Sequence, residues 1–251
     1  MDKQQVQRII ILALVVLSIA FPLAFTENIY ILHVMTTAFI FIIAINGLNI
    51  LAGFTGQLSL AHAGFFAIGA YSLGILTTKY DMPYWISFFL AIVLTAVIGL
   101  FLGIFALRTK EHFFAIYTLI IGFLIYLVIN TWDEMTGGIR GLIGIPLPDA
   151  IGPITFDTPL SMYYLVLVFM LLSVFVARRI VHSLLGRTFI SIRNSEELAQ
   201  TIGINTALNK LYAFVISVVF AALSGVLYAS FNRFLGPEIA NLPMVFNFLM
   251  Y

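Results

Sequence analysis

Polar and ionisable side chains that could carry chemistry gather in one stretch, "GRTFISIRNSEELAQTIGIN" (residues 186–205), between two of the most apolar segments of the chain. Asn194 stands three residues before Glu197, which is the spacing of a helix N-cap and the acid that hydrogen-bonds back to it. Gly203 supplies the residue type that most often follows a helix in the left-handed conformation. This spacing predicts a short helix over Ser195–Ile202.

The predicted short helix has side chains suited to docking. Glu196 and Glu197 lie in its first turn, where the helix dipole favours negative charge. Leu198, Ala199 and Ile202 fall on one face. A helix of this length is marginally stable alone, so it needs a surface to pack against. Two adjacent acids disfavour an anionic lipid leaflet, so a second protein is favoured over the headgroup region as that surface.

A second group of polar residues lies inside an apolar run. Gln57, Ser59 and His62 occur close together there, whereas His33 stands alone in the preceding apolar run. Polar groups within membrane spans either line a pathway or form hydrogen bonds between helices. Both interpretations stay open for the three residues, with helix-to-helix bonding the commoner case, and His33 is interpreted as a packed or interfacial residue.

The sequence lacks the motifs of several function classes. It has no Cys, no Walker motif and no His/Asp/Glu cluster with metal-ligand spacing. We therefore expect no catalytic residue, cofactor or metal site on this chain. No carboxylate falls inside an apolar run, which argues against an intramembrane enzyme and a proton-coupled transporter. Sodium coupling through backbone carbonyls at broken helices stays open, as does a passive channel or a structural subunit.

Composition identifies the broad class of the protein. Of the 251 residues, 62% are hydrophobic and 9% charged, and the mean hydropathy is +1.09. Soluble domains carry about 25% charged residues, so this chain cannot cover a water-facing surface. The net charge of +1 gives no indication of a nucleic-acid partner. The protein is therefore predicted to lie in a membrane.

The membrane-spanning elements follow from the lengths of the apolar runs. A helix needs about 20 residues to cross the hydrocarbon core, and strands of a membrane barrel alternate over about 10. The sequence thus predicts an all-α, polytopic helix bundle forming one domain over residues 1–251, with the start of an eighth span near the C-terminus. The uncharged segment Ala52–Gln57 is either a loop or an intramembrane break. The seven predicted spans are Ile9–Phe25, Ile29–Leu51, Gln57–Thr78, Pro83–Leu107, Phe113–Asn130, Pro159–Ala177 and Leu211–Asn232.

Counting Lys and Arg in the loops predicts the orientation. With the N-terminus inside, nine of these residues fall in inner loops and three in outer loops. The N-terminus and the segment 178–210 are therefore expected on the cytoplasmic side. The inner residues are Lys3, Arg8, Arg108, Lys110, Arg178, Arg179, Arg187, Arg193 and Lys210, and the outer ones are Lys79, Arg140 and Arg233.

The glycine-rich features are explained by helix packing and by turns, without a phosphate-binding loop. Gly99 and Gly103 form a small-xxx-small pair, which is typical of closely packed helices. The outer segment Thr136–Pro146, "TGGIRGLIGIP", lacks the Lys-Ser/Thr ending of a P-loop. It is interpreted as a structured turn, or as a contact for a binding protein or a plug over a pathway.

Four sequence blocks together cover most of the chain from Gly47 to Glu238. One is the charged stretch with the helix after it, "GRTFISIRNSEELAQTIGINTALNKLYAFVISVVFAALSGVLYA". The others are "GLNILAGFTGQLSLAHAGFFAIGAYS", "LRTKEHFFAIYTLIIG" and "MTGGIRGLIGIPLP". In their order along the chain the blocks resemble the permease subunits of branched-chain amino-acid ABC transporters of the LivM type, and the charged stretch resembles the family's coupling-loop signature. The family also includes permeases for urea and short-chain amides.

The resemblance implies a type II importer subunit in a bacterial or archaeal cytoplasmic membrane. Expected partners are a homologous LivH-type permease, two cytoplasmic ATPases that use ATP and Mg, an extracytoplasmic binding protein and membrane lipid. Gln57, Ser59 and His62 are candidates for the translocation path. The short helix becomes the coupling helix, whose ATPase-docking residues are Asn194, Glu196, Glu197, Leu198, Ala199, Ile202, Gly203 and Ile204.

The substrate class stays open within this resemblance. Branched-chain amino acids are expected, with urea or short-chain amides, or an ion-coupled secondary transporter of another class, as alternatives. The chain ends at Tyr251 within an apparent eighth span, whereas permeases of this type continue further. We therefore expect the C-terminus to be truncated.

Overall fold

The computed structural model describes residues 15–22, 28–106 and 111–250. A helical segment over residues 15–22 precedes the labelled helices. The α-helices are α2 (Ile29–Leu48), α3 (His62–Thr78), α4 (Tyr84–Ala106), α5 (Glu111–Thr131), α6 (Asp133–Thr136), α7 (Pro159–Val181), α8 (Leu184–Asn194), α9 (Glu196–Thr201), α10 (Thr206–Asn232) and α11 (Leu242–Met250). The remaining elements are the π-helix η1 (Asn49–Phe54), the 3₁₀ helices η2 (Gly138–Arg140) and η3 (Pro237–Ala240), and the antiparallel strands β1 (Leu142–Ile143) and β2 (Phe234–Leu235).

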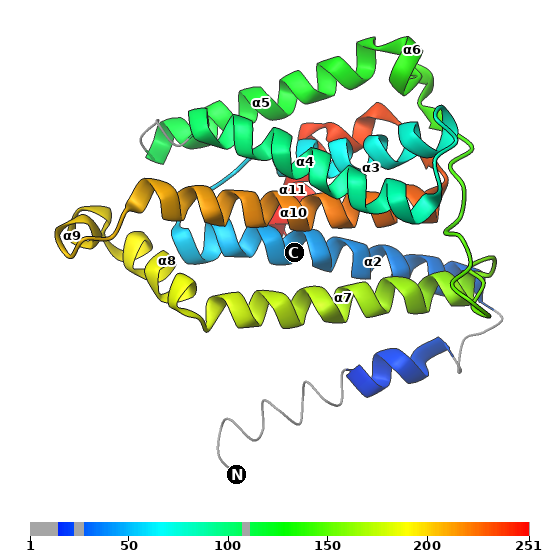
Figure 1. Cartoon of the computed structure of the whole chain (residues 1–251), viewed down its shortest axis with the longest axis horizontal. Helices are drawn as coiled ribbons and strands as arrows, with labels where there is room; N and C mark the ends of the chain where they lie inside the picture. The colour runs from blue at the N-terminus through cyan, green and yellow to red at the C-terminus, as the bar shows by residue number, and fades with distance from the viewer. Residues whose placement is uncertain (1–14, 23–27, 107–110, 251) are drawn as a thin grey trace.

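The long helices lie side by side in one bundle with α10 at its centre (Figure 1). Helix α10 packs against α2, α3 and α4, and α7 packs against α2. In Figure 1, α5 and α7 lie on opposite sides of the bundle. Helices α8 and α9 lie at one end of the bundle, here called the α9 end, and α6 lies at the opposite end.

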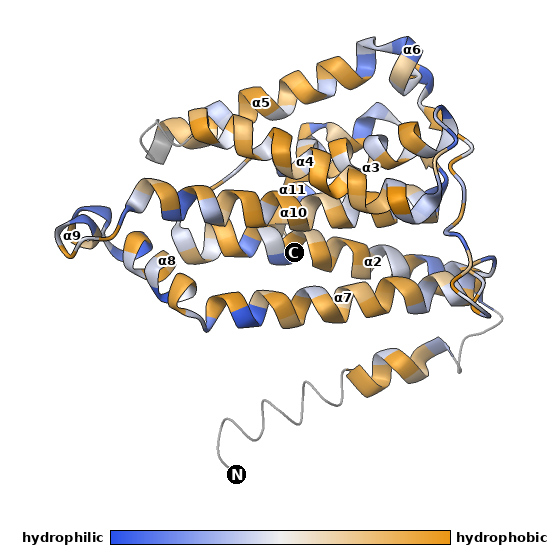
Figure 2. Cartoon of the chain, in the orientation of Figure 1, coloured by the Kyte–Doolittle hydropathy of each residue, from blue (hydrophilic) through white to orange (hydrophobic). Residues whose placement is uncertain are grey.

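The helices confirm the prediction of an all-α polytopic membrane bundle. Five of the described helices are long and apolar enough to cross a membrane. Hydrophobic residues cover their length, and hydrophilic residues gather at the two ends of the bundle (Figure 2). The five are Ile29–Phe54, Tyr84–Ala106, Phe113–Thr131, Pro159–Val181 and Thr206–Asn232.

The predicted spans correspond to the helices, but several of their ends are shifted. Helix α3 has 17 residues because the first part of the predicted span Gln57–Thr78 is not helical. Helix α10 begins at Thr206, before the predicted Leu211, because Asn205 Oδ1 caps it by accepting from Leu208 N–H at 3.1 Å. The first predicted span, Ile9–Phe25, lies largely outside the described residues, as do four of the inner-loop cations.

The segment between α2 and α3 is partly a helix and partly a non-helical break whose side chains alternate between buried and exposed. Helix α2 continues as the π-helix η1, so Ala52–Phe54 extend the span. Gly56 then takes a left-handed φ of +75°, and an extended stretch leads to the start of α3. Within that stretch Leu60 N–H donates to Thr118 Oγ1 of α5 at 3.0 Å, so a neighbouring helix satisfies this freed backbone group.

Small residues bring the backbones of the central helices into contact. A Cβ on Gly225 of α10 would lie 2.0 Å from the carbonyl oxygen of Phe66 in α3. At Gly99 and Gly103 of α4, added Cβ atoms would collide with Val218 and Phe214 of α10. The close packing predicted for the Gly99/Gly103 pair is therefore confirmed.

The glycine-rich segment Thr136–Pro146 is folded onto the end of the bundle opposite α9. Strand β1 pairs with β2, and Leu142 and Ile145 pack over Gly74 of α3. Arg233 Nε donates to the carbonyl oxygen of Ile145 at 3.3 Å. These contacts fit the interpretation as a structured turn.

Candidate functional site

The predicted coupling element is a helical hairpin formed by α8 and α9. The structure corrects its N-cap, because Asn194 is the last residue of α8 and Ser195 is the residue with extended backbone before α9. Ser195 Oγ accepts from Leu198 N–H at 3.3 Å. The prediction that Asn194 is the N-cap, paired with Glu197, was therefore wrong. The N-cap is the next residue, Ser195.

The C-terminal end of α9 is as predicted. Gly203 has a φ of +84°, and its N–H donates to Gln200 C=O at 3.0 Å. The N–H of Ile204 reaches back to Ala199 C=O at 3.1 Å. These two bonds form a Schellman motif, which satisfies carbonyls that a helix end would otherwise leave unpaired. Helix α9 therefore has a fixed geometry despite its length of six residues.

The three apolar residues predicted on one face of the short helix do not act alike. Ala199 is 2% exposed and packs within the chain, whereas Leu198 and Ile202 are 68% and 73% exposed. Only part of the face predicted for docking is therefore accessible. Leu198 and Ile202 project outward, whereas Ala199 is packed against the chain itself. Glu197 is also exposed. This arrangement presents two large apolar side chains on a rigid polar hairpin, which is the chemistry of a contact surface.

Two charged contacts tie the hairpin to the bundle. The guanidinium of Arg193, next to the end of α8, donates to Gly53 C=O in η1. The ammonium group of Lys210 in α10 bonds to the carboxylate of Glu196, the first residue of α9. Sequence reasoning did not assign these roles to Arg193 or Lys210, since no local spacing relates either residue to its partner.

The candidate path residues lie at the break before α3. His62 is 1% exposed; its Nε2 lies 2.8 Å from Ala44 C=O of α2, and its Nδ1 lies 3.4 Å from Ser217 Oγ of α10. The ring of Phe248 in α11 lies edge-on to the imidazole, with centroids 5.8 Å apart. His62 thus joins α2, α3 and α10, which matches the helix-to-helix interpretation.

Gln57 and Ser59 differ from His62 in their contacts. Both side chains are buried, at 6% and 1% exposed. The Oε1 atom of Gln57 has no hydrogen-bond partner among the described residues. Burying an unpaired amide oxygen costs roughly 1–3 kcal/mol, so Gln57 is the candidate path residue with unused hydrogen-bonding capacity.

Charges divide between the two ends of the bundle. The α9 end carries five cations among the described residues, and the opposite end carries three cations together with acids in its loops. The five are Arg178, Arg179, Arg187, Arg193 and Lys210, and the three are Lys79, Arg140 and Arg233. In the described part of the chain, Lys and Arg are thus more numerous at the α9 end. The positive-inside rule associates such an excess with the cytoplasmic side.

Comparisons with known proteins agree with these features. Residues 30–251 match the family model described as "Branched-chain amino acid transport system / permease component". The chain is 32% identical to the high-affinity branched-chain amino acid transport system permease protein LivM of Salmonella typhimurium and 31% identical to LivM of Escherichia coli. Each match covers 92% of this chain and 59% of the relative, so the chain spans less than two thirds of either relative's length. No solved structure matches the chain.

Proposed function

The chain belongs to the branched-chain amino acid transport permease family, and from this premise we propose that it is the membrane subunit of an ATP-driven importer of branched-chain amino acids. Membership of a permease family makes the chain a transport subunit and not an enzyme. The observation that carries the importer proposal is the rigid α8–α9 hairpin, which presents exposed Leu198 and Ile202 beyond the spans.

The proposed partners follow from the family to which the chain belongs. Two cytoplasmic ATPases hydrolyse ATP, since this sequence carries no Walker motif of its own. A homologous permease of the LivH type completes the path, and an extracytoplasmic binding protein delivers the amino acid. The cationic α9 end faces the cytoplasm, in line with the positive-inside rule.

The mechanism transmits movement from the hairpin to the central helices. Closure of the ATPases displaces α9, whose Glu196 is bound to Lys210 near the start of α10. Because Arg193 donates to Gly53 C=O, a movement of the hairpin also moves η1. Because α10 packs against α2, α3 and α4, a shift of this helix moves most of the bundle. The non-helical break, with the buried side chain of Gln57, then lies between helices that shift relative to one another.

Reconstituted uptake tests the proposal. Proteoliposomes holding the chain with its homologous permease, ATPases and binding protein are expected to accumulate labelled L-leucine only when ATP is present on the ATPase side. Labelled urea is measured in parallel, because the same family resemblance covers urea permeases. Accumulation of urea without leucine would show that the substrate is urea or a short-chain amide and not a branched-chain amino acid. Leucine uptake driven by a sodium gradient without ATP would instead establish a secondary transporter.

A further inference from the structure

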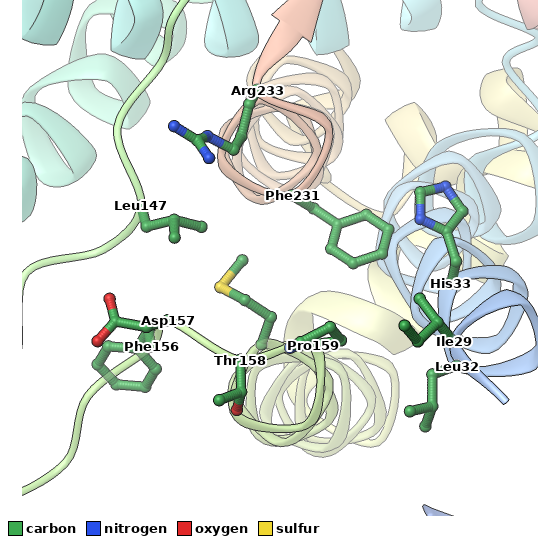
Figure 3. A pocket seen from close by; sticks show the side chains of 11 residues that line it. Ile29, Leu32, His33, Leu147, Phe156, Asp157, Thr158, Pro159, Phe231 and Arg233 are labelled. Carbon is green, nitrogen blue, oxygen red and sulfur yellow. The ribbon is translucent and has the colours of Figure 1, made fainter. Parts of the chain in front are cut away.

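A cavity of about 230 Å³ opens at the end of the bundle opposite α9 (Figure 3). It lies where the first residues of α2 and α7 meet the last residues of α10. Apolar side chains form most of its wall, and the ring of Phe231 packs at a tilt against that of His33, with 4.6 Å between the ring centroids. Its main apolar contributors are Ile29, Leu32, Leu147, Phe156, Met162 and Phe231.

Two side chains of opposite charge, Asp157 and Arg233, line this same cavity. In Figure 3 both lie toward its left side, with Leu147 between them in the view. No ion pair within the described part of the chain involves either side chain. Among the described residues nothing neutralises the carboxylate or the guanidinium, so a ligand can supply the opposite charge to each.

The backbone at Arg233 is held firmly in an unusual conformation. Its φ is +58°, a left-handed value that is uncommon for a residue with a side chain. Its N–H donates to Ala229 C=O at 2.9 Å, its C=O accepts from Gly144 N–H at 3.2 Å, and its Nε donates to Ile145 C=O at 3.3 Å. No hydrogen bond to a described residue occupies the Nη groups, which are donors suited to a carboxylate.

The backbone next to Asp157 is held by local structure. Asp157 is itself exposed, and it directly precedes Thr158, which caps α7 through a reciprocal pair of bonds with Ser161. In that pair Ser161 N–H donates to Thr158 Oγ1 at 3.1 Å. The cavity thus has its acidic residue beside the capped start of one helix and its basic residue at the end of another, so hydrogen-bonded backbone places both without a ligand. Such preorganisation lowers the entropic cost of binding.

We propose that this cavity binds a free α-amino acid with an apolar side chain, with Arg233 contacting the carboxylate and Asp157 contacting the ammonium group. A simple anion would meet Asp157 and a simple cation would meet Arg233, whereas a zwitterion satisfies both charges. The volume lies below the range of about 300–1,000 Å³ typical of drug-sized ligands, so the ligand is small. The site rests on the proposed import function and adds to it a binding place within this chain.

Competition binding tests the site on the full chain in its assembled transporter, with the binding protein omitted. The probe is labelled L-leucine, and the competitors are leucinol, which lacks the carboxylate, and 4-methylpentanoate, which lacks the amine. In the unmodified chain leucine is expected to compete at least about tenfold better than either analogue, since each analogue loses one charged contact. Arg233→Gln should abolish the advantage over leucinol, and Asp157→Asn the advantage over 4-methylpentanoate.

Matched controls keep this test specific. Lys79→Gln and Glu134→Gln remove exposed charges at the same end of the bundle but outside the cavity, and they should preserve both preferences. Ile29→Trp should weaken leucine binding by filling the cavity without changing charge. Unchanged selectivity in both charge variants, or equal loss of all three ligands, would overturn the site. Leucine transport by the unmodified complex is measured alongside. If the complex transports leucine but the binding results contradict the site, the site is wrong and the import function stands. If the complex transports no leucine, the proposed import function is wrong.

Discussion

The carboxylate of Glu196 at the start of α9 is bound to the ammonium group of Lys210 in α10, fourteen residues further along the chain. The Lys210 side chain is 9% exposed and that of Glu196 is 29% exposed, so the pair is largely removed from water. Removing one member of such a pair leaves a poorly solvated charge without a partner. Within the part of the chain that the structure describes, this ion pair therefore connects the exposed hairpin directly to the central helix.

The Glu196–Lys210 pair should couple ATP hydrolysis to uptake. Glu196→Gln is expected to lower leucine uptake per ATP hydrolysed several-fold, because α9 then moves without carrying α10. The exchanged pair Glu196→Lys with Lys210→Glu should recover most of the coupling. Uptake and hydrolysis are measured in the same proteoliposomes, with Glu197→Gln as the exposed control. Full coupling in the single variant would show that the pair only stabilises the loop.

The cap of α9 gives a prediction that separates two neighbouring residues. Ser195→Ala should destabilise α9 by about 1 kcal/mol, because the Leu198 N–H loses its acceptor. Asn194→Ala should change local stability by less than about 0.5 kcal/mol, since Asn194 is an exposed residue at the end of α8. Hydrogen exchange of the α9 amides measures both. Faster exchange in Asn194→Ala alone would contradict the cap seen here.

The error at the cap shows where sequence reasoning reached its limit. Asn194 and Ser195 are both good N-cap residues, and only the acid at Glu197 favoured the first. The structure extends α8 through Asn194, so the backbone turns one residue later. Local spacing predicted the existence of the short helix and the glycine that ends it, but it could not fix the first residue.

The spans could be predicted because hydropathy depends on length and composition alone. The contacts that define the sites could not. Lys210 bonds to Glu196, and His62 contacts Ala44 and Ser217, through approaches between segments distant in the sequence. The burial of Ala199 against its own chain likewise depends on how α9 folds back toward α10, which no helical periodicity reveals.

The contact between α10 and α3 predicts a strong packing effect. Gly225→Leu would place a side chain against Phe66 C=O, where even a Cβ would lie at 2.0 Å, so the helices must separate. Overpacking of this kind costs typically 1–3 kcal/mol or more. The thermal unfolding midpoint in detergent should fall, whereas Ala38→Leu on the exposed face of α2 should leave it nearly unchanged. Equal midpoints for the two variants would contradict the close approach.

The orientation of the bundle can be tested in the natural Cys-free background. Gln200→Cys in α9 should react with a membrane-impermeant thiol reagent only from the cytoplasmic side. Ala150→Cys at the opposite end should react only from outside. Ala150 is preferable to its neighbour Asp149, whose Oδ2 accepts from Tyr84 N–H at 3.0 Å. Labelling of Gln200→Cys in intact cells would reverse the orientation and remove α9 from the ATPases.

The divided face of α9 predicts different phenotypes for adjacent substitutions. Leu198→Arg places a charge on the outward surface and should leave the isolated subunit within about 0.5 kcal/mol of its original stability, because Leu198 is 68% exposed. In the complex that charge would be buried against the ATPase, so ATPase copurification and leucine-stimulated hydrolysis should fall at least about tenfold.

Ala199→Arg instead forces a charge into the hairpin itself and should speed hydrogen exchange throughout α9 before any partner binds. Copurification measured beside exchange separates the two effects, with Thr188→Arg on α8 as a charge-matched control. Normal ATPase retention in Leu198→Arg would show that the outward face of α9 does not dock, and the charged hairpin would then serve only to orient the chain in the membrane.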